Sequence, residues 1–144
     1  KGVSDINSRS IGIEIVHPGH VGGLPPYPDA QIDAVIALGL DIAQRWGIPP
    51  ERVLGHSDVA PARKRDPGEK FPWHSLANSG VGHWVTPAPV VRGESIMLGT
   101  ISDEVLSLQQ ALARYGYSVP QTGKYDAATM EVVTAFQAAR PPLM

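Results

Sequence analysis

Apolar and polar positions alternate near the start of the chain and then follow a different pattern. In residues 10–16, SIGIEIV, the three isoleucines face one way and Glu14 faces the other. This alternation predicts a β-strand. Residues 17–29, HPGHVGGLPPYPD, are rich in glycine and proline, which predicts a loop long enough to line a groove.

The next segment has the spacing of an amphipathic helix. Apolar residues form one stripe over 30–46, Asp29 is suited to cap its start, and Gly47 is suited to end it. Residues 52–55 then predict a short strand that carries His56 at its end. The order strand, helix, strand predicts an α/β fold in which a mixed sheet is flanked by helices.

Regular patterning is lost over residues 85–100, which read as a linker or as a strap across the surface. Beyond this segment, Ser102 and Asp126 each precede an apolar helical stripe and can cap a helix. The predicted division is 1–84 for the α/β region, 85–100 for the linker, and 101–144 for a small all-α module.

Composition narrows the functional classes. The chain has 144 residues, 42% of them hydrophobic, with 12 basic and 14 acidic residues and a formal charge of -2. This balance gives no electrostatic footprint for nucleic acid. The chain has no cysteine, which excludes disulfides, thiolate zinc sites and cysteine nucleophiles within it. No apolar run approaches the ~18 residues of a membrane span.

The candidate chemistry is concentrated in residues 55–73, GHSDVAPARKRDPGEKFPW. His56 and Asp66 lie ten positions apart among prolines, so only a loop can bring them together. An imidazole and a carboxylate are a good partial ligand set for zinc, and catalytic zinc takes three protein ligands and one water. One ligand is therefore missing from this stretch.

Three further side chains fit an amide-hydrolysing zinc site. Lys64 lies two positions before Asp66, so in an extended segment its ammonium shares a side with the carboxylate and can stabilise an oxyanion. Glu14 is the best-placed carboxylate to carry a proton. Asp58 either orients His56 or caps a turn.

Simpler interpretations remain open from the residues alone. The histidine and aspartate of this stretch can be unrelated hydrogen-bonding groups, Glu14 a salt-bridged strand residue, and Lys64 part of a solvated basic run. His17 and His20 imitate a ligand pair, although a flexible Gly-Pro loop is a poor zinc cage.

The string GHSDVAPARKRDPGEKFPW closely resembles the signature of the zinc-dependent N-acetylmuramoyl-L-alanine amidases of the type 2 family. That family also includes T7-type lysozymes and peptidoglycan recognition proteins. NSRSIGIEIV resembles its earlier strand motif, so the resemblance covers about residues 7–73. It implies that His56 and Asp66 are zinc ligands, that Glu14 is the catalytic glutamate, and that Lys64 assists at the transition state.

The resemblance also implies a ligand outside this sequence. The family's first zinc histidine lies well before the SIGIE motif, and few residues precede Ser10 here. We expect a preceding segment of the same protein to supply it; otherwise this fragment does not assemble the complete site. The loop residues His17, Pro18, Gly19 and His20 are expected to bind substrate.

Residues LSLQQALARYGYSVPQTGKYDAATMEVVTAFQAARP are similar to the small helical peptidoglycan-binding domain of many cell-wall hydrolases. That family usually continues with another turn and helix, so we expect the wall-binding surface here to be truncated. The alternative for this module is a helical cap that only packs on the amidase region.

Together these resemblances imply a zinc-dependent enzyme that cleaves the amide between the lactyl group of N-acetylmuramic acid and L-alanine. The expected partner is peptidoglycan or a muropeptide. The expected location is the periplasm or cell envelope, where the protein is either anchored by a lipid to the outer membrane or secreted. Membrane contact is expected only through an N-terminal anchor outside this chain. The alternatives are a non-catalytic peptidoglycan-recognition protein and a structural adaptor.

Overall fold

The computed structural model describes residues 5–89, 93 and 95–139. These residues form five α-helices, none of them long and apolar enough to cross a membrane. The α-helices are α1 (Asp29–Trp46), α2 (His56–Val59), α3 (Trp73–Asn78), α4 (Asp103–Tyr115) and α5 (Ala127–Ala139). Short 3-10 turns occupy η1 (Asn7–Arg9), η2 (His20–Gly22) and η3 (Pro50–Arg52).

The predicted α/β fold with a mixed sheet is wrong for the described part of the chain, which contains no β-strand. Residues 10–16 have no regular structure, and Ile11 and Ile13 are 49% and 40% exposed. A strand exists only where a neighbouring chain segment completes its hydrogen-bond ladder. In the described residues, the one bridge joins Ile101 to Lys124, far from this segment in sequence.

The second predicted strand, residues 52–55, is also wrong. The chain turns through η3 and reaches Gly55 in an extended conformation, and His56 is the first residue of α2. His56 is therefore presented at a helix start instead of a strand end. The carboxylate of Asp58 closes this first turn by accepting the Gly55 N–H at 3.0 Å, which is one of the two roles expected of it.

The helix predicted over 30–46 is confirmed as α1. Gly47 ends it in the left-handed conformation, with φ of 61°, and its N–H bonds to the Ala43 carbonyl. Pro28, and not Asp29, is the N-cap residue. Asp29 instead lies in the first turn, where its negative charge interacts favourably with the positive end of the helix dipole.

Both caps predicted after residue 100 are also confirmed. The Ser102 hydroxyl accepts the Val105 N–H at 3.3 Å at the start of α4. Asp126 Oδ1 accepts the Thr129 N–H at 2.9 Å at the start of α5. Residues 101–139 are called the C-terminal module from here on, and residues 5–84 the N-terminal region.

Each part has its own hydrophobic cluster. In the N-terminal region, Tyr27, Phe71 and Trp73 pack edge to face with centroid separations of 5.2 and 4.8 Å. Ile32, Leu76 and Val81 complete that cluster. In the C-terminal module the buried members are Leu112, Ala113, Tyr117, Val119, Val132 and Ala135.

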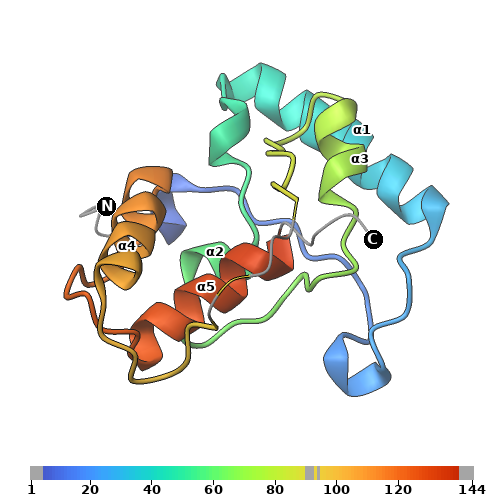
Figure 1. The fold of residues 1–144 in the computed structure, drawn as a ribbon. Coiled ribbons are helices and arrows are strands. Elements are labelled where there is room, and N and C mark those ends of the chain that lie inside the picture. The colour runs from blue at the N-terminus through green and yellow to red at the C-terminus, as the bar shows by residue number, and fades with distance from the viewer. Residues whose placement is uncertain (1–4, 90–92, 94, 140–144) are drawn as a thin grey trace.

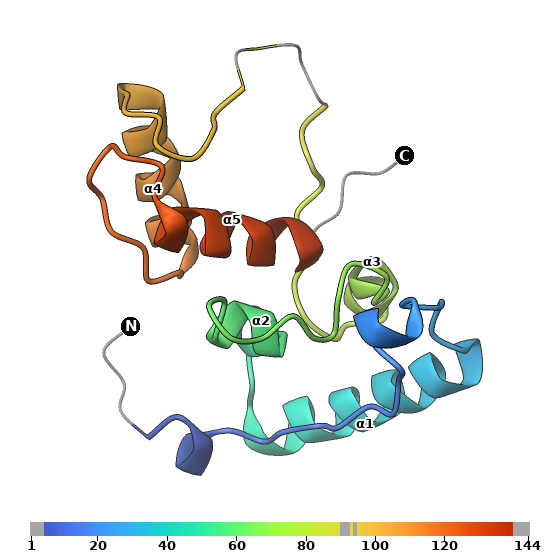
Figure 2. The same cartoon turned by 90° about the horizontal axis from the view of Figure 1, so that it is seen from below.

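The two parts lie against each other (Figure 1). Figure 2 shows α2 and α3 between α1 on one side and α5 on the other. Contacts between α2 and α5 and the packing of Ala139 into the N-terminal cluster agree with this arrangement. The division at 85–100 stays a prediction, since its residues 90–92 and 94, with 1–4 and 140–144, lie outside the described residues.

Candidate functional site

The structure brings together the two predicted metal ligands. His56 Nδ1 lies 3.0 Å from Asp66 Oδ2, and their side chains are 44% and 61% exposed. The two residues are ten positions apart in the chain. The pair is therefore formed by the fold of the intervening loop, and it faces solvent.

Backbone contacts around α2 fix this geometry. The Ser57 N–H donates to the Asp66 carbonyl at 2.9 Å, which anchors the carboxylate loop to the helix next to His56. Gly55 favours the close approach of the loop, because a Cβ there would lie 3.0 Å from Pro67 Cδ, a tight contact that the proline would have to relieve by moving. The loop returns through a cis peptide bond between Asp66 and Pro67.

Tyr27 is a residue near the site that the sequence reasoning missed. Its hydroxyl donates to the Pro67 carbonyl at 2.9 Å. Burial, and then the negative charge of Asp66, raise the pKa of Tyr27. Its ring stacks on His17 with centroids 4.0 Å apart. The sequence offers no signal for this contact, which spans 40 positions.

The predicted substrate-binding loop is tied down by its two histidines. His17 Nδ1 accepts the Gly19 N–H at 3.1 Å, so its Nε2 is the donor to the Pro25 carbonyl at 2.9 Å. His20 Nε2 lies 2.9 Å from Glu69 Oε2. The backbone N–H of Glu69 and the contact with His20 lower the pKa of Glu69, against a smaller opposing effect of desolvation.

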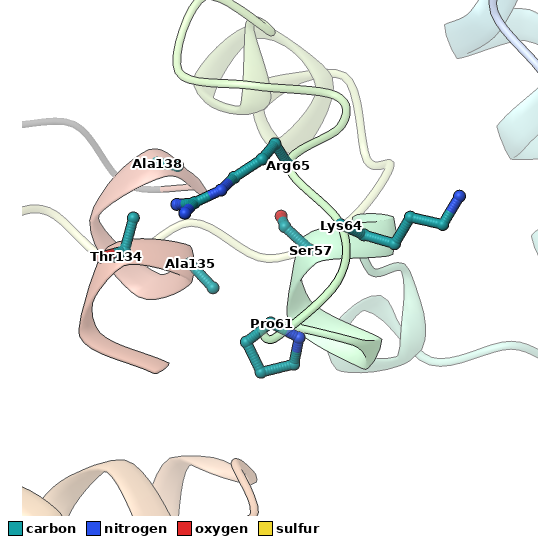
Figure 3. A pocket seen from close by; sticks show the side chains of 7 residues that line it. All are labelled: Ser57, Pro61, Lys64, Arg65, Thr134, Ala135 and Ala138. Atoms are coloured by element: carbon teal, nitrogen blue, oxygen red, sulfur yellow. The ribbon is translucent and has the colours of Figure 1, made fainter. Parts of the chain in front are cut away.

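Lys64 and Arg65 leave the loop in opposite directions. Figure 3 shows Arg65 pointing toward α5, across a cavity of about 10 Å³, while Lys64 points away from it. That Lys64 and Asp66 share one side of the loop stays a prediction. Glu14 is exposed and forms no hydrogen bond or ion pair with His56, Lys64 or Asp66.

A larger groove of about 390 Å³ opens between α1 and α3. Its charged lining residues are Asp29, Asp33 and Lys70, and Tyr27 forms part of its wall. None of the loop residues 17–20 lines it. Tyr27 therefore contributes both to the wall of the groove and to the hydrogen bond with Pro67, the residue after Asp66.

The His56–Asp66 pair fits two positions of a tetrahedral zinc site. Ligand atoms at about 2.1 Å from the ion lie about 3.4 Å apart, so a small outward shift from the observed contact makes room for it. Within the part of the chain that the structure describes, no third histidine, cysteine or carboxylate completes a metal-binding group. A complete site needs one more protein ligand.

Family comparisons match both parts of the chain. The family described as N-acetylmuramoyl-L-alanine amidase matches residues 1–69. A family of peptidoglycan binding domains matches residues 102–140.

The chain is also similar to individual proteins. It is 39% identical to N-acetylmuramoyl-L-alanine amidase AmiD of Escherichia coli (strain K12) over 95% of this chain and 51% of that protein. Among solved structures, AmiD in complex with anhydro-N-acetylmuramic acid-L-Ala-D-gamma-Glu-L-Lys has a TM-score of 0.60 and 40% identity, covering 83% of this chain and 46% of that one. AmpDh3 from Pseudomonas aeruginosa, in complex with anhydromuramic pentapeptide, has a TM-score of 0.56 and 30% identity, covering 82% and 46%.

The chain spans about half the length of AmiD and of these solved chains. The similarity to AmiD nevertheless runs through both the N-terminal region and the C-terminal module. Both parts of this chain therefore align, in the same order, with AmiD.

Proposed function

We propose that the protein hydrolyses an amide bond of peptidoglycan or muropeptides, because residues 1–69 match the N-acetylmuramoyl-L-alanine amidase family. The bond is the one between the lactyl group of N-acetylmuramic acid and L-alanine. The observation that carries this proposal is the pairing of His56 with Asp66 at 3.0 Å, which a family motif alone does not guarantee. AmiD bound to an anhydro-muropeptide supports the substrate class.

We propose that zinc is the cofactor, held by His56, Asp66 and a histidine from residues that precede Lys1 in the whole protein. When bound, zinc lowers the pKa of a water molecule toward ~7 and polarises the substrate carbonyl. The exposed side chains of Ile11 and Ile13 support a preceding segment that covers this face.

The remaining steps belong to side chains of this chain. Glu14 takes a proton from the attacking water and returns it to the leaving amine of L-alanine. Lys64 places its ammonium beside the oxygen that becomes negatively charged at the transition state. The loop of His17, Pro18, Gly19 and His20 lies next to this site and contacts the muropeptide.

The C-terminal module supports a role at the cell wall. Its match to peptidoglycan binding domains favours attachment to peptidoglycan, and with it a location in the periplasm or cell envelope.

The test uses the native protein with the residues that precede Lys1. Zinc is titrated into metal-free protein by calorimetry, and release of free stem peptide from anhydro-muropeptide is followed by mass spectrometry. We expect one zinc ion to bind per chain, and we expect a chelator to abolish the release of stem peptide. Zinc binding without peptide release would contradict it and favour the non-catalytic recognition protein.

A ligand variant separates zinc binding from folding. His56→Ala is expected to abolish both zinc binding and peptide release, while the unfolding temperature of the metal-free protein is unchanged because His56 is solvent-exposed. His74→Ala is the matched control, since His74 is an exposed histidine of α3 with no part in the proposed site. Equal losses in the two variants would contradict the assignment.

A further inference from the structure

A polar contact crosses between the two parts of the chain at the helix that carries His56. The Tyr117 hydroxyl donates a hydrogen bond to Asp58 Oδ1 across 59 positions of sequence. Tyr117 is 6% exposed and belongs to the hydrophobic cluster of the C-terminal module, whereas Asp58 lies in α2. Because packing fixes the ring, the hydroxyl holds Asp58 in one orientation.

The other oxygen of the Asp58 carboxylate contacts the backbone next to His56. Asp58 Oδ2 accepts the Gly55 N–H and so caps the turn that begins with His56. With four residues, α2 is too short to form alone, and its orientation depends on such contacts. Since Ser57 also binds the Asp66 carbonyl, the placement of α2 determines both metal ligands.

Helix α5 packs directly on this segment. The cavity between α2 and α5 holds about one water molecule, so the two surfaces are in close contact. Figure 3 shows Ser57 facing the small side chain of Ala135, with Arg65 reaching toward α5. Both Ser57 and Ala135 are 4% exposed. The C-terminal module is therefore docked against the region that carries the site.

From these contacts we propose that the C-terminal module is part of the scaffold of the zinc site, with Tyr117 as a positioning residue that acts through Asp58 on His56. This inference rests on the proposed function and extends it beyond attachment to the wall. A module that only tethers the protein affects hydrolysis of insoluble peptidoglycan alone. A module that positions α2 also affects a soluble muropeptide and zinc affinity.

The first experiment compares the native protein with Tyr117→Phe, which keeps the packed ring and removes the hydroxyl. Zinc affinity is expected to fall about 10-fold, the lower range for partners that orient metal ligands. On soluble anhydro-muropeptide, kcat falls while KM is unchanged. In metal-free protein, amide exchange at Gly55 becomes about 5-fold faster, as for one lost hydrogen bond.

Tyr125→Phe is the matched control in the same module. The structure shows no hydrogen bond from the Tyr125 hydroxyl to any described residue, and its backbone pairs with Gly99 and Thr100, away from α2 in sequence. It should leave Gly55 exchange, zinc affinity and soluble turnover at native values. A loss as large as that of Tyr117→Phe would overturn the inference.

A double-mutant cycle tests the route through Asp58. Asp58→Ala should weaken zinc affinity at least as much as Tyr117→Phe, and combining the two should add no further loss. Additive losses, or a Tyr117→Phe effect confined to unfolding temperature and insoluble wall, would overturn the inference. Failure of the native protein to bind zinc would instead overturn the proposed function, while Gly55 exchange in metal-free protein still decides this inference.

Discussion

The two parts of the molecule differ in the burial of their most strongly hydrogen-bonded polar side chains. In the C-terminal module, Gln109 is 0% exposed and all its hydrogen-bonding groups have protein partners at 2.9 Å. In the N-terminal region, His56 and Asp66 are about half exposed and bind mainly each other. A polar group that is fully satisfied inside protein stabilises one conformation, whereas an exposed pair remains available to an ion or substrate.

Because of this difference, we expect substitutions in the two parts of the chain to affect different properties, catalytic activity in one and stability in the other. We expect substitutions at the exposed pair and its neighbours to change activity with little effect on unfolding. Substitutions at the buried amide should unfold the module first and lower activity only as a consequence. The inferred contact from Tyr117 to Asp58 is the place where the two effects meet.

The largest expected effect is on catalysis, in Glu14→Gln. Removing a general base that carries a proton should lower kcat by about 10²- to 10⁴-fold. Zinc affinity and unfolding temperature should remain at native values, because Glu14 is exposed and lies outside the ligand pair. Stopped assays of stem-peptide release, with calorimetry for zinc, measure both quantities.

Glu51→Gln provides the control, since Glu51 is also an exposed glutamate of the N-terminal region. It should be indistinguishable from the native protein. If Glu14→Gln keeps more than a tenth of native kcat, Glu14 is not the proton carrier. The exposed residues of the N-terminal region would then not include the catalytic base.

The second prediction concerns stability, in Gln109→Leu. This change leaves the Thr122 and Gly123 amides and the Lys124 carbonyl without the partner that the buried Gln109 side chain supplies. The free energy of unfolding should fall by about 3 kcal/mol, measured by denaturant titration of the protein. Gln110→Leu is the control at the next, exposed position and should stay within about 0.5 kcal/mol. Equal values for both variants would contradict the buried-amide account.

The sequence predicted the fold best where the deciding contact is local. Gly47 at the end of α1 and the caps at Ser102 and Asp126 were predicted correctly, because each bond closes within about one helical turn. The strand over 10–16 was wrong, since alternation shows which side chains face together but not whether a ladder partner is present.

The candidate site shows the same limit. Residue chemistry left the pairing of His56 with Asp66 open and the family resemblance implied it, and the structure places the two side chains in contact. The contacts that hold this pair were not predicted. Tyr27 reaches Pro67 across 40 positions and Tyr117 reaches Asp58 across 59, and no periodicity reports contacts of that separation.

The third prediction tests the support from the N-terminal side, in Tyr27→Phe. The ring keeps its stacking on His17, but the Pro67 carbonyl loses its donor beside Asp66. We expect about 1 kcal/mol lower unfolding free energy and a several-fold weaker zinc affinity. Denaturant titration and calorimetry measure the two effects. Loss of stability with native zinc affinity would show that Tyr27 supports the core without positioning Asp66.

The smallest expected effect is a pH dependence carried by Glu69, which links the loop that follows Asp66 to the loop of residues 17–20 through His20. Because folding lowers the pKa of Glu69, its stabilising contribution is complete above the unfolded value near 4.5 and is lost as pH falls through the lower folded value. Glu69→Gln should remove this part of the acid sensitivity, about 0.5 kcal/mol for so exposed a pair. Unfolding temperatures recorded from pH 6 to pH 3 should therefore converge for the native protein and the variant at the acid end, where both lack the carboxylate. Curves that stay parallel over that range would mean that the loop is held by His17 and Tyr27 alone.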